Sequence, residues 1–348
     1  MKTLLITGGA GFLGYHVCNK LSKKFDKIIV VDIDNFIREE YPKNVDFFKA
    51  DIVNKNILED VFKKIKPDLV IHGAAALPLY SKKRIWEVNF RGSQNVLELS
   101  LKYNVERMVF ISSTAVYGVP EKHPLYENDE RIGVGPYGET KIAAEKLCER
   151  YRKKGLCVPI IRPKTFIGVG RLGVFQILYD WIENGKRIPI IGNGKNRYQL
   201  LEVGDLVDSI ELVLLKNAKL VNDTFNVGAE NFKTVYEDVT ELCKYSKSGA
   251  KVMRTPASFV KFFLRLLEML KLSPLYKWVY GTADKDSFVS IDKMKERFNW
   301  IPKYSNQDAL IRSYQWYLDN KHTLQKKSGI THRVAWKQGF LGLIKKIL

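Results

Sequence analysis

The sequence predicts an α/β fold: a doubly wound parallel sheet with a smaller region interleaved toward the C-terminus. Two observations predict it. The first half of the chain alternates short apolar runs with longer amphipathic stretches, the pattern of strands and crossover helices. The first apolar run also ends in a glycine cluster, TGGAGFLG at 7–14, that leads into a stretch with helical spacing. The 348 residues suffice for one large domain or two coupled ones.

Short apolar runs give the candidate strands in order. Between the first two, Leu13, Val17 and Leu21 recur at helical spacing, and the stretch 87–101 repeats this pattern. After residue 162 the alternation weakens and Gly and Pro interrupt the chain. The expected strands are 2–7, 27–32, 45–49, 69–72, 108–112, 158–161 and 224–228.

These elements predict three parts. The main sheet takes residues 1–161, with 202–228 returning to it. The second region takes 162–201 and 229–320, and residues 321–348 form a basic amphipathic tail.

The net charge of +19 fits three partners: nucleic acid, an anionic membrane or an acidic small substrate. No helix-turn-helix, zinc-finger or RNP pattern accompanies the charge, so we expect no nucleic acid partner. The four cysteines form no CxxC pair, which predicts neither a metal site nor a disulfide framework. The first apolar run is too short for a signal peptide, so we expect a cytoplasmic protein.

Two stretches combine apolar and basic residues. In 258–272 the charged residues share one helical face, which predicts an amphipathic helix and not a membrane span. Packing within the protein is the favoured interpretation there, with a membrane or dimer contact as the alternative. In 333–348, docking on an anionic membrane and ordinary packing stay equally open, and the first would make the protein peripheral at the inner face of the membrane.

The glycine cluster satisfies two registers, Gly9-x-Gly11-x-x-Gly14 and Gly8-x-x-Gly11-x-x-Gly14. Either one lets the backbone approach a pyrophosphate at a helix N-terminus. A tight structural turn is the alternative, but the position between a strand and a helix favours a dinucleotide. Asp32, at the end of the second strand, can accept hydrogen bonds from both ribose hydroxyls and would repel a 2′-phosphate. It therefore favours NAD over NADP, unless it is an ordinary loop acid.

Tyr137 and Lys141 lie four residues apart on an expected helix, on one face. The ammonium of Lys141 and a positively charged nicotinamide would lower the pKa of the phenol, which makes Tyr137 a usable base for a substrate hydroxyl. Taken alone, such a pair is more often an exposed helix pair.

Together these motifs resemble the extended short-chain dehydrogenase/reductases, which include the NAD-dependent sugar-nucleotide epimerases and dehydratases. The resemblance covers roughly residues 1 to 230 and rests on motifs in matching order. The matching residues are TGGAGFLG at 7–14, Asp32, Asp51-Ile52, HGAAA at 72–76, Asn89 in VNFRGS, SSTAVYG at 112–118, YGETK at 137–141 and Arg162-Pro163.

The resemblance implies a Rossmann domain with a smaller C-terminal substrate domain, and a homodimer. It implies that Tyr137 is the acid/base, that Lys141 holds the nicotinamide ribose and lowers the phenol pKa, and that Ser113 hydrogen-bonds the reacting oxygen. The glycine register it favours is Gly8, Gly11 and Gly14. The implied NAD-binding residues are Gly8, Gly11, Phe12, Leu13, Gly14, Asp32, Asp51, Ile52, Ala74, Ala75, Ala76, Asn89, Tyr137, Lys141 and Pro163.

The chain departs from the family on the substrate side. Sugar dehydratases carry acids after the Ser113 position, where this chain has Thr114 and Ala115, so the acid/base pair for elimination is missing. Thr165 replaces an asparagine that helps bind the diphosphate, and Arg197 stands one place before the usual phosphate-binding arginine. The candidate substrate residues are Ser113, Lys164, Thr165 and Arg197, although Lys164 and Arg197 could equally be solvated surface cations.

Three functions follow from this pattern. The leading one is a UDP-hexose 4-epimerase-like enzyme that oxidises a sugar hydroxyl with NAD and reduces the ketone from its other face. The alternative is an NAD-dependent dehydrogenase of a hydrophobic secondary alcohol, like the 3β-hydroxysteroid dehydrogenases, which the missing asparagine and the amphipathic stretches favour. A non-catalytic NAD-binding protein comes third.

Overall fold

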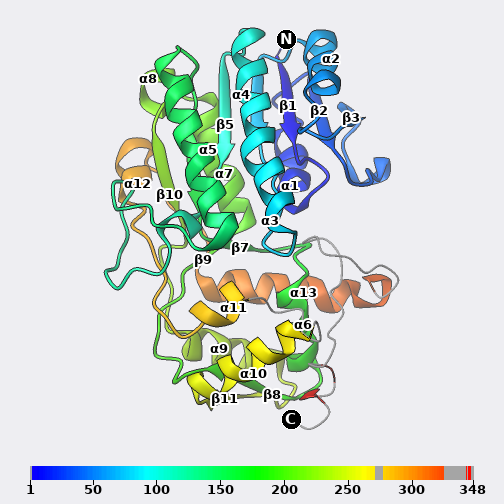
Figure 1. Cartoon of the computed structure of the whole chain (residues 1–348). Helices are drawn as coiled ribbons and strands as arrows, with labels where there is room; N and C mark the ends of the chain where they lie inside the picture. The colour runs from blue at the N-terminus through cyan, green and yellow to red at the C-terminus, as the bar shows by residue number, and fades with distance from the viewer. Residues whose placement is uncertain (1, 271–276, 325–341, 343, 346–348) are drawn as a thin grey trace.

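The computed structural model describes residues 2–270, 277–324, 342, 344 and 345. A seven-stranded parallel sheet forms its upper half in Figure 1, in the order β10-β6-β5-β4-β1-β2-β3. This architecture confirms the predicted fold class. The strands are β1 (Thr3–Thr7), β2 (Lys27–Asp32), β3 (Val45–Lys49), β4 (Leu69–His72), β5 (Arg107–Ile111), β6 (Ile160–Pro163) and β10 (Thr224–Val227).

The sixth strand begins two residues later than expected. Cys157 forms an isolated bridge with Arg107, and Val158 donates its N–H to the side chain of Asn222. The Pro159 carbonyl accepts the N–H of Phe110 at 2.8 Å, but Pro159 has no N–H to donate, so continuous pairing begins only at Ile160.

Helices cover both faces of the sheet because its strands alternate their buried side chains between the two faces. Leu4 and Ile6 face one core and Leu5 faces the other. The first core is covered by α1 (Phe12–Leu21), α7 (Val203–Leu215), α8 (Ala218–Val221) and α12 (Asp292–Phe298). The second is covered by α2 (Lys55–Ile65), α3 (Lys82–Trp86), α4 (Ser93–Lys102) and α5 (Gly135–Lys153).

The helix expected over 87–101 begins with a π-helical turn, Glu87–Gly92, before it continues as α4. A Cβ on Gly92 would lie 2.5 Å from the Ile52 side chain, so the turn packs closely on the third strand's loop. The turn also carries Asn89, whose amide contacts the loop after β4.

The second region is smaller and lies below the main sheet in Figure 1. Its strands form two parallel pairs, β7 (Thr165–Ile167) with β9 (Leu200–Glu202), and β8 (Arg187–Ile191) with β11 (Lys251–Thr255). Its core is built mainly from its helices. These are α6 (Val174–Glu183), α9 (Val235–Ser246), α10 (Ala257–Met269), α11 (Lys277–Thr282) and α13 (Asn306–Leu324).

The two amphipathic stretches differ in how much of them is described. The first forms α10, which buries Leu264 and Leu267 in the second region but leaves its opposite face exposed. Most of 333–348 lies outside the described residues. Of it, Ile344 packs on the second region's core and Lys345 contacts Asp180 at 2.6 Å. Within the described part of the chain, no helix is both long and apolar enough to cross a membrane.

Candidate functional site

The glycine turn connects β1 to α1. Gly8 has φ +75, and a Cβ there would lie 2.7 Å from the backbone nitrogen of Ala74. A Cβ on Gly14 would lie 2.4 Å from the Cα of Gly9. Gly11 is the N-cap of α1, and no side chain caps the helix there. The turn therefore needs glycine at both Gly8 and Gly14, and it leaves the positive end of α1 open.

A cavity of about 240 Å³ lies beside this turn, at the carboxyl ends of β1, β2 and β4. Ligands of doubly wound sheets bind at this edge. Most of the predicted NAD-binding residues line the cavity: Gly8, Gly11, Phe12, Leu13, Asp32, Asp51, Ile52, Ala74, Ala75, Ala76, Tyr137 and Lys141. Gly14, Asn89 and Pro163 do not line it.

Those three residues contact the segments around the cavity and not the cavity itself. Asn89 is buried, accepts the Ala76 N–H at 2.7 Å and donates to the Ala76 carbonyl at 3.2 Å. Pro163 ends β6, where its carbonyl accepts a hydrogen bond from Thr114. Gly14 allows the close packing of α1 described above. Asn89 can thus act on a cofactor only through the loop that it holds.

Asp32 supports the glycine turn as well as lining the cavity. Its Oδ2 accepts the N–H of Ala10 at 2.9 Å, and its Oδ1 accepts the N–H of Ile33 at 2.7 Å and of Asp34 at 3.1 Å. Burial raises the pKa of the Asp32 carboxyl, and these backbone hydrogen bonds oppose the shift. Asp32 is therefore not an ordinary solvated loop acid.

Asp51 forms an ion pair with Arg84 that no motif in the sequence predicts. Its Oδ2 lies 2.6 Å from Nη2 of Arg84, which also lines the cavity, and its Oδ1 accepts the N–H of Val53. Arg84 comes from the first turns after the alanine-rich loop and carries no motif of its own. Arg84 is recognised as a residue of the site only from its contact with Asp51 in the cavity wall.

The ring of His72, at the end of β4, is buried and hydrogen-bonded at both nitrogens. One ring nitrogen contacts Thr7 Oγ1 at 2.6 Å and the other contacts Ser93 Oγ at 2.8 Å. Burial lowers the pKa of His72 to about 3, and the charge of Lys141 adds to the shift. The ring is therefore neutral near pH 7, and we assign it a structural role in joining β1, β4 and α4.

Tyr137 and Lys141 line the cavity, and Ser113, which does not line it, contacts Tyr137. Ser113 accepts the N–H of Ala115 at 3.1 Å and hydrogen-bonds the Tyr137 phenol. The Lys141 Nζ lies 5.9 Å from the centre of the Tyr137 ring and donates to the Ile111 carbonyl at 2.8 Å. Because Lys141 is buried on α5, the pair is not the exposed helix pair of the alternative interpretation.

In the chain alone, burial dominates the pKa of Tyr137. Burial raises it to about 12, and the hydrogen bond with Ser113 opposes the shift, so Lys141 does not lower it in this structure. Burial also lowers the pKa of Lys141 to about 8, against the charge of Glu145. The physical reason is that desolvation outweighs the one ammonium, whose Nζ bonds a backbone carbonyl and not the phenol oxygen.

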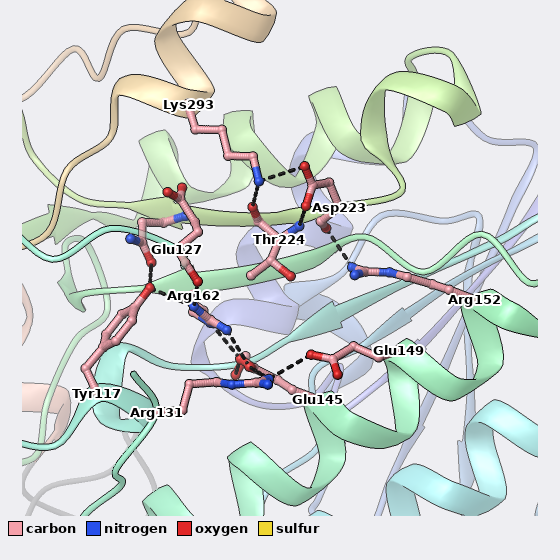
Figure 2. Close-up of polar contacts among 12 residues, drawn as sticks. Tyr117, Glu127, Arg131, Glu145, Glu149, Arg152, Arg162, Asp223, Thr224 and Lys293 are labelled. Atoms are coloured by element: carbon pink, nitrogen blue, oxygen red, sulfur yellow. Dashed lines mark hydrogen bonds and ion pairs between the residues drawn. The ribbon is translucent and has the colours of Figure 1, made fainter. Parts of the chain in front are cut away.

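A buried ion pair fixes the helix that carries Tyr137 and Lys141 (Figure 2). Glu145, one turn beyond Lys141, accepts Arg162 Nε at 2.9 Å and Nη2 at 2.7 Å, and also the Ser112 hydroxyl at 2.5 Å. Although burial raises the pKa of Glu145, the hydrogen bonds and charge of Arg162 hold it below its usual value. In the sequence, Glu145 follows Tyr137 and Lys141 at intervals of four residues. This spacing places all three on one side of the expected helix.

The predicted substrate residues divide into two groups. Lys164 is buried, its Nζ donates to Ser287 Oγ at 2.6 Å, and it lies over the Tyr198 ring. Thr165 hydrogen-bonds the Tyr198 hydroxyl at 2.9 Å. Burial lowers the pKa of Lys164 to about 7, and no carboxylate among the described residues forms an ion pair with it. Lys164 is thus not a solvated surface cation.

Arg197 belongs to the other group. It is exposed, and its guanidinium lies 4.6 Å from the ring centre of Phe232 and 4.7 Å from that of Phe288. The chain is extended here, with bridges at Arg197 and Tyr198, so successive side chains point to opposite sides. The shift of the arginine by one position therefore separates it from Lys164 and Thr165, and Tyr198 takes its place.

Known proteins share this architecture. The model of the NAD dependent epimerase/dehydratase family matches residues 4–228. A bifunctional UDP-glucose 4-epimerase and UDP-xylose 4-epimerase of Pisum sativum is 35% identical, over 92% of this chain and 96% of the relative. An uncharacterised protein of Sinorhizobium fredii is 34% identical, over 99% of this chain and 86% of its own length.

Among solved structures, the UDP-glucose 4-epimerase of Thermotoga maritima with UDP-glucose matches with a TM-score of 0.77 and 25% identity, over 92% of this chain and 99% of that chain. These findings confirm the expected enzyme class and its NAD dependence. The chain therefore belongs to the NAD-dependent epimerase/dehydratase family of extended short-chain dehydrogenase/reductases.

Proposed function

We propose that this chain is a nucleotide-sugar epimerase of the UDP-hexose 4-epimerase type. The observation that carries the proposal is that Tyr137 and Lys141 line the cavity beside the Gly8 turn while Ser113 hydrogen-bonds the Tyr137 phenol. The named activity of the Pisum sativum relative, which matches nearly the whole chain, supports the same reaction class.

The residues around the cavity fit NAD. The open N-terminus of α1 and the close approach of Gly8 to Ala74 suit a pyrophosphate, and Asp32 lies at the end of β2 where a ribose would bind. When bound there, NAD would supply reversible hydride acceptance at the carbon that carries the reacting hydroxyl, which allows that carbon to be reduced from the opposite face. Lys141 would hold the nicotinamide ribose, because its Nζ has donors to spare beyond the Ile111 carbonyl.

The protein's own residues would move the proton. Tyr137 would take it from the sugar hydroxyl and return it after the ketone has turned over. Ser113 already accepts a hydrogen bond from Ala115, so its own hydroxyl proton is available for the phenol oxygen or the substrate oxygen. The positive charge of Lys141, together with that of the oxidised nicotinamide, would favour the ionised phenol that burial disfavours in the chain alone.

Elimination is not part of the proposal. Directly after Ser113, Thr114 donates its hydroxyl to the Pro163 carbonyl and Ala115 is buried, so these two positions supply no acid/base group. Reversible oxidation of a secondary alcohol needs only the proton relay of Tyr137.

Lys164 and Thr165 are the proposed contacts to the diphosphate. Lys164 is a buried cation beside Tyr198 and Ser287, and an incoming phosphate would supply the negative charge that the described residues do not. The substrate-binding region at 162–201 and 229–320 stays a prediction, of which residues 162 and 163 belong to β6 and α12 packs on the main sheet. The homodimer and the cytoplasmic location stay predictions.

One observation favours the second candidate, an NAD-dependent dehydrogenase of a hydrophobic alcohol. Thr165, where the family has an asparagine, already hydrogen-bonds the Tyr198 hydroxyl, which reduces the polar groups free for a diphosphate. This alternative keeps the same roles for Tyr137 and Lys141 but ends with reduced cofactor.

An assay of purified protein with NAD and a panel of UDP-hexoses, with sterols in parallel, separates the functions. The proposal predicts the 4-epimer of UDP-glucose or UDP-N-acetylglucosamine without accumulation of reduced cofactor. Reduced cofactor with a sterol would identify the dehydrogenase, and tight NAD binding without turnover would identify a binding protein.

A further inference from the structure

Helix α10 presents an apolar face to solvent at the end of the second region. Five side chains on this face are between 44% and 72% exposed. Their spacing of three, four, three and one residues places them within about a third of the helical circumference. We call this set the α10 face, and it consists of Phe259, Phe262, Leu266, Met269 and Leu270.

The opposite side of α10 explains why the helix is stable with this face exposed. Leu264 and Leu267 are buried in the second region's core. Lys261 bonds the Gly281 carbonyl at 3.0 Å and Asp284 at 2.5 Å. The buried side of α10 therefore holds the helix on the second region, and the α10 face makes no contribution to that packing. An exposed set of this size indicates a binding surface.

Basic residues outnumber acids along the chain that leads into α10. Between the acids Glu241 and Glu268 there are six basic residues, of which Lys244 pairs with Glu241 and Lys261 with Asp284. Arg265 is exposed at the edge of the face, and β11, which leads directly into α10, exposes Lys251 and Arg254. In the described part of the chain, none of these three forms an ion pair with a carboxylate.

We propose that the α10 face docks on the surface of an anionic phospholipid membrane. Phenylalanine, leucine and methionine would enter the boundary between headgroups and acyl chains, and the basic residues would contact the lipid phosphates. A second copy of the chain fits less well, because it would bring another net charge of +19 and a second Arg265 against the first. This docking site differs from the tail at 333–348 and does not depend on the proposed reaction.

The placement of α10 agrees with docking. Together with β8 and β11, it lies at the end of the molecule farthest from the N-terminus, beyond the main sheet (Figure 1). The helix can therefore lie along a flat surface while the cavity at the sheet edge stays in solution.

The test is co-sedimentation of the full chain with sucrose-loaded vesicles of phosphatidylcholine, alone or with about one third phosphatidylglycerol. The wild type should bind the anionic vesicles, and added salt should weaken binding. The double variant Phe262→Ser/Met269→Ser should lower the partition coefficient by about tenfold or more. Its melting temperature should not fall, because both side chains are 72% exposed.

A matched control is Ile301→Ser, which removes an apolar side chain that is 61% exposed but lies outside α10. It should bind vesicles as the wild type does. The proposal is overturned if the wild type stays in the supernatant with anionic vesicles at low salt, or if the double variant binds as well as the wild type. It is also overturned if light scattering shows a dimer that only the double variant loses, since the face would then join two copies.

Discussion

The carboxylate of Glu145 and the guanidinium of Arg162 form a buried double contact, with Nε–Oε1 2.9 Å and Nη2–Oε2 2.7 Å. The contact joins α5 to β6 (Figure 2). Because Tyr137 and Lys141 lie two turns and one turn before Glu145 on α5, the ion pair fixes the orientation of the helix that carries both residues. Glu145 also favours the charged form of Lys141.

Glu145→Gln should therefore destabilise the protein and shift its pH profile. The loss leaves Arg162 buried without its counter-charge, at a cost of about 3 kcal/mol in the free energy of unfolding. It also removes the charge that keeps the pKa of Lys141 from falling below about 8, so the loss of turnover at high pH should move to lower pH. Thermal unfolding and a pH profile of kcat/KM measure both effects.

Glu149→Gln is the matched control. Glu149 lies one turn further along α5, is more exposed, and pairs only with Arg131 among the described residues. If this variant shifts the pH profile as much as Glu145→Gln does, the electrostatic role assigned to Glu145 is wrong.

Tyr137→Phe should keep NAD binding and lower turnover by a factor of about a hundred or more, because it removes only the phenol oxygen. Calorimetry with NAD and an epimerase assay give the two numbers. Tyr126→Phe, at an exposed tyrosine outside the cavity, should change neither. Turnover near the wild-type rate in Tyr137→Phe would rule out the proposed proton transfer.

Much of the fold could be predicted because the main sheet is buried on both faces. Several strands are continuous apolar runs such as 28–31, and Gly8, Asp32, Gly73 and Gly228 mark the ends of four of them. The sixth strand begins later than expected because the run 158–161 includes Pro159, which has no N–H for the ladder. The α10 helix was recognised, but its periodicity could not tell which face would find a partner.

Site residues that belong to a motif could be predicted from the sequence. Contacts between residues from distant segments could not. Asp32, Tyr137 and Lys141 follow from their positions after a strand or along a helix. Arg84 opposite Asp51, and Thr7 and Ser93 around His72, are contacts between segments far apart in the chain. Spacing reveals the neighbouring charge of Lys141 but not the cost of burial, which raises the pKa of Tyr137 in the chain alone.

Asp32→Asn should weaken the preference for NAD over NADP. The amide keeps an oxygen for the Ala10 N–H but removes the charge that would repel a 2′-phosphate. The ratio of the dissociation constants of NADP and NAD should fall by about tenfold or more. Asp34→Asn, at the neighbouring acid that also lines the cavity, is the control. An equal effect of the two variants would assign the selectivity to the general charge of the loop.

Binding of UDP should weaken as the pH rises. Burial lowers the pKa of Lys164 to about 7, so the ammonium that would attract a phosphate is present below this pH and is lost above it. Between about pH 6 and about pH 8 the affinity should fall by up to tenfold, and Lys164→Met should remove most of this dependence. Lys195→Met, at an exposed lysine, is the control for calorimetry. An unchanged pH dependence in Lys164→Met would show that Lys164 does not contact the diphosphate.

The central claim is that the protein oxidises a sugar carbon and reduces the same carbon from its other face. The most direct measurement is NMR of the product formed from UDP-glucose that carries deuterium at C4. An epimerase of this type should give UDP-galactose with the deuterium kept at C4 and no lasting increase in reduced cofactor. Loss of the deuterium to solvent, or net reduction of NAD without the epimer, would contradict it.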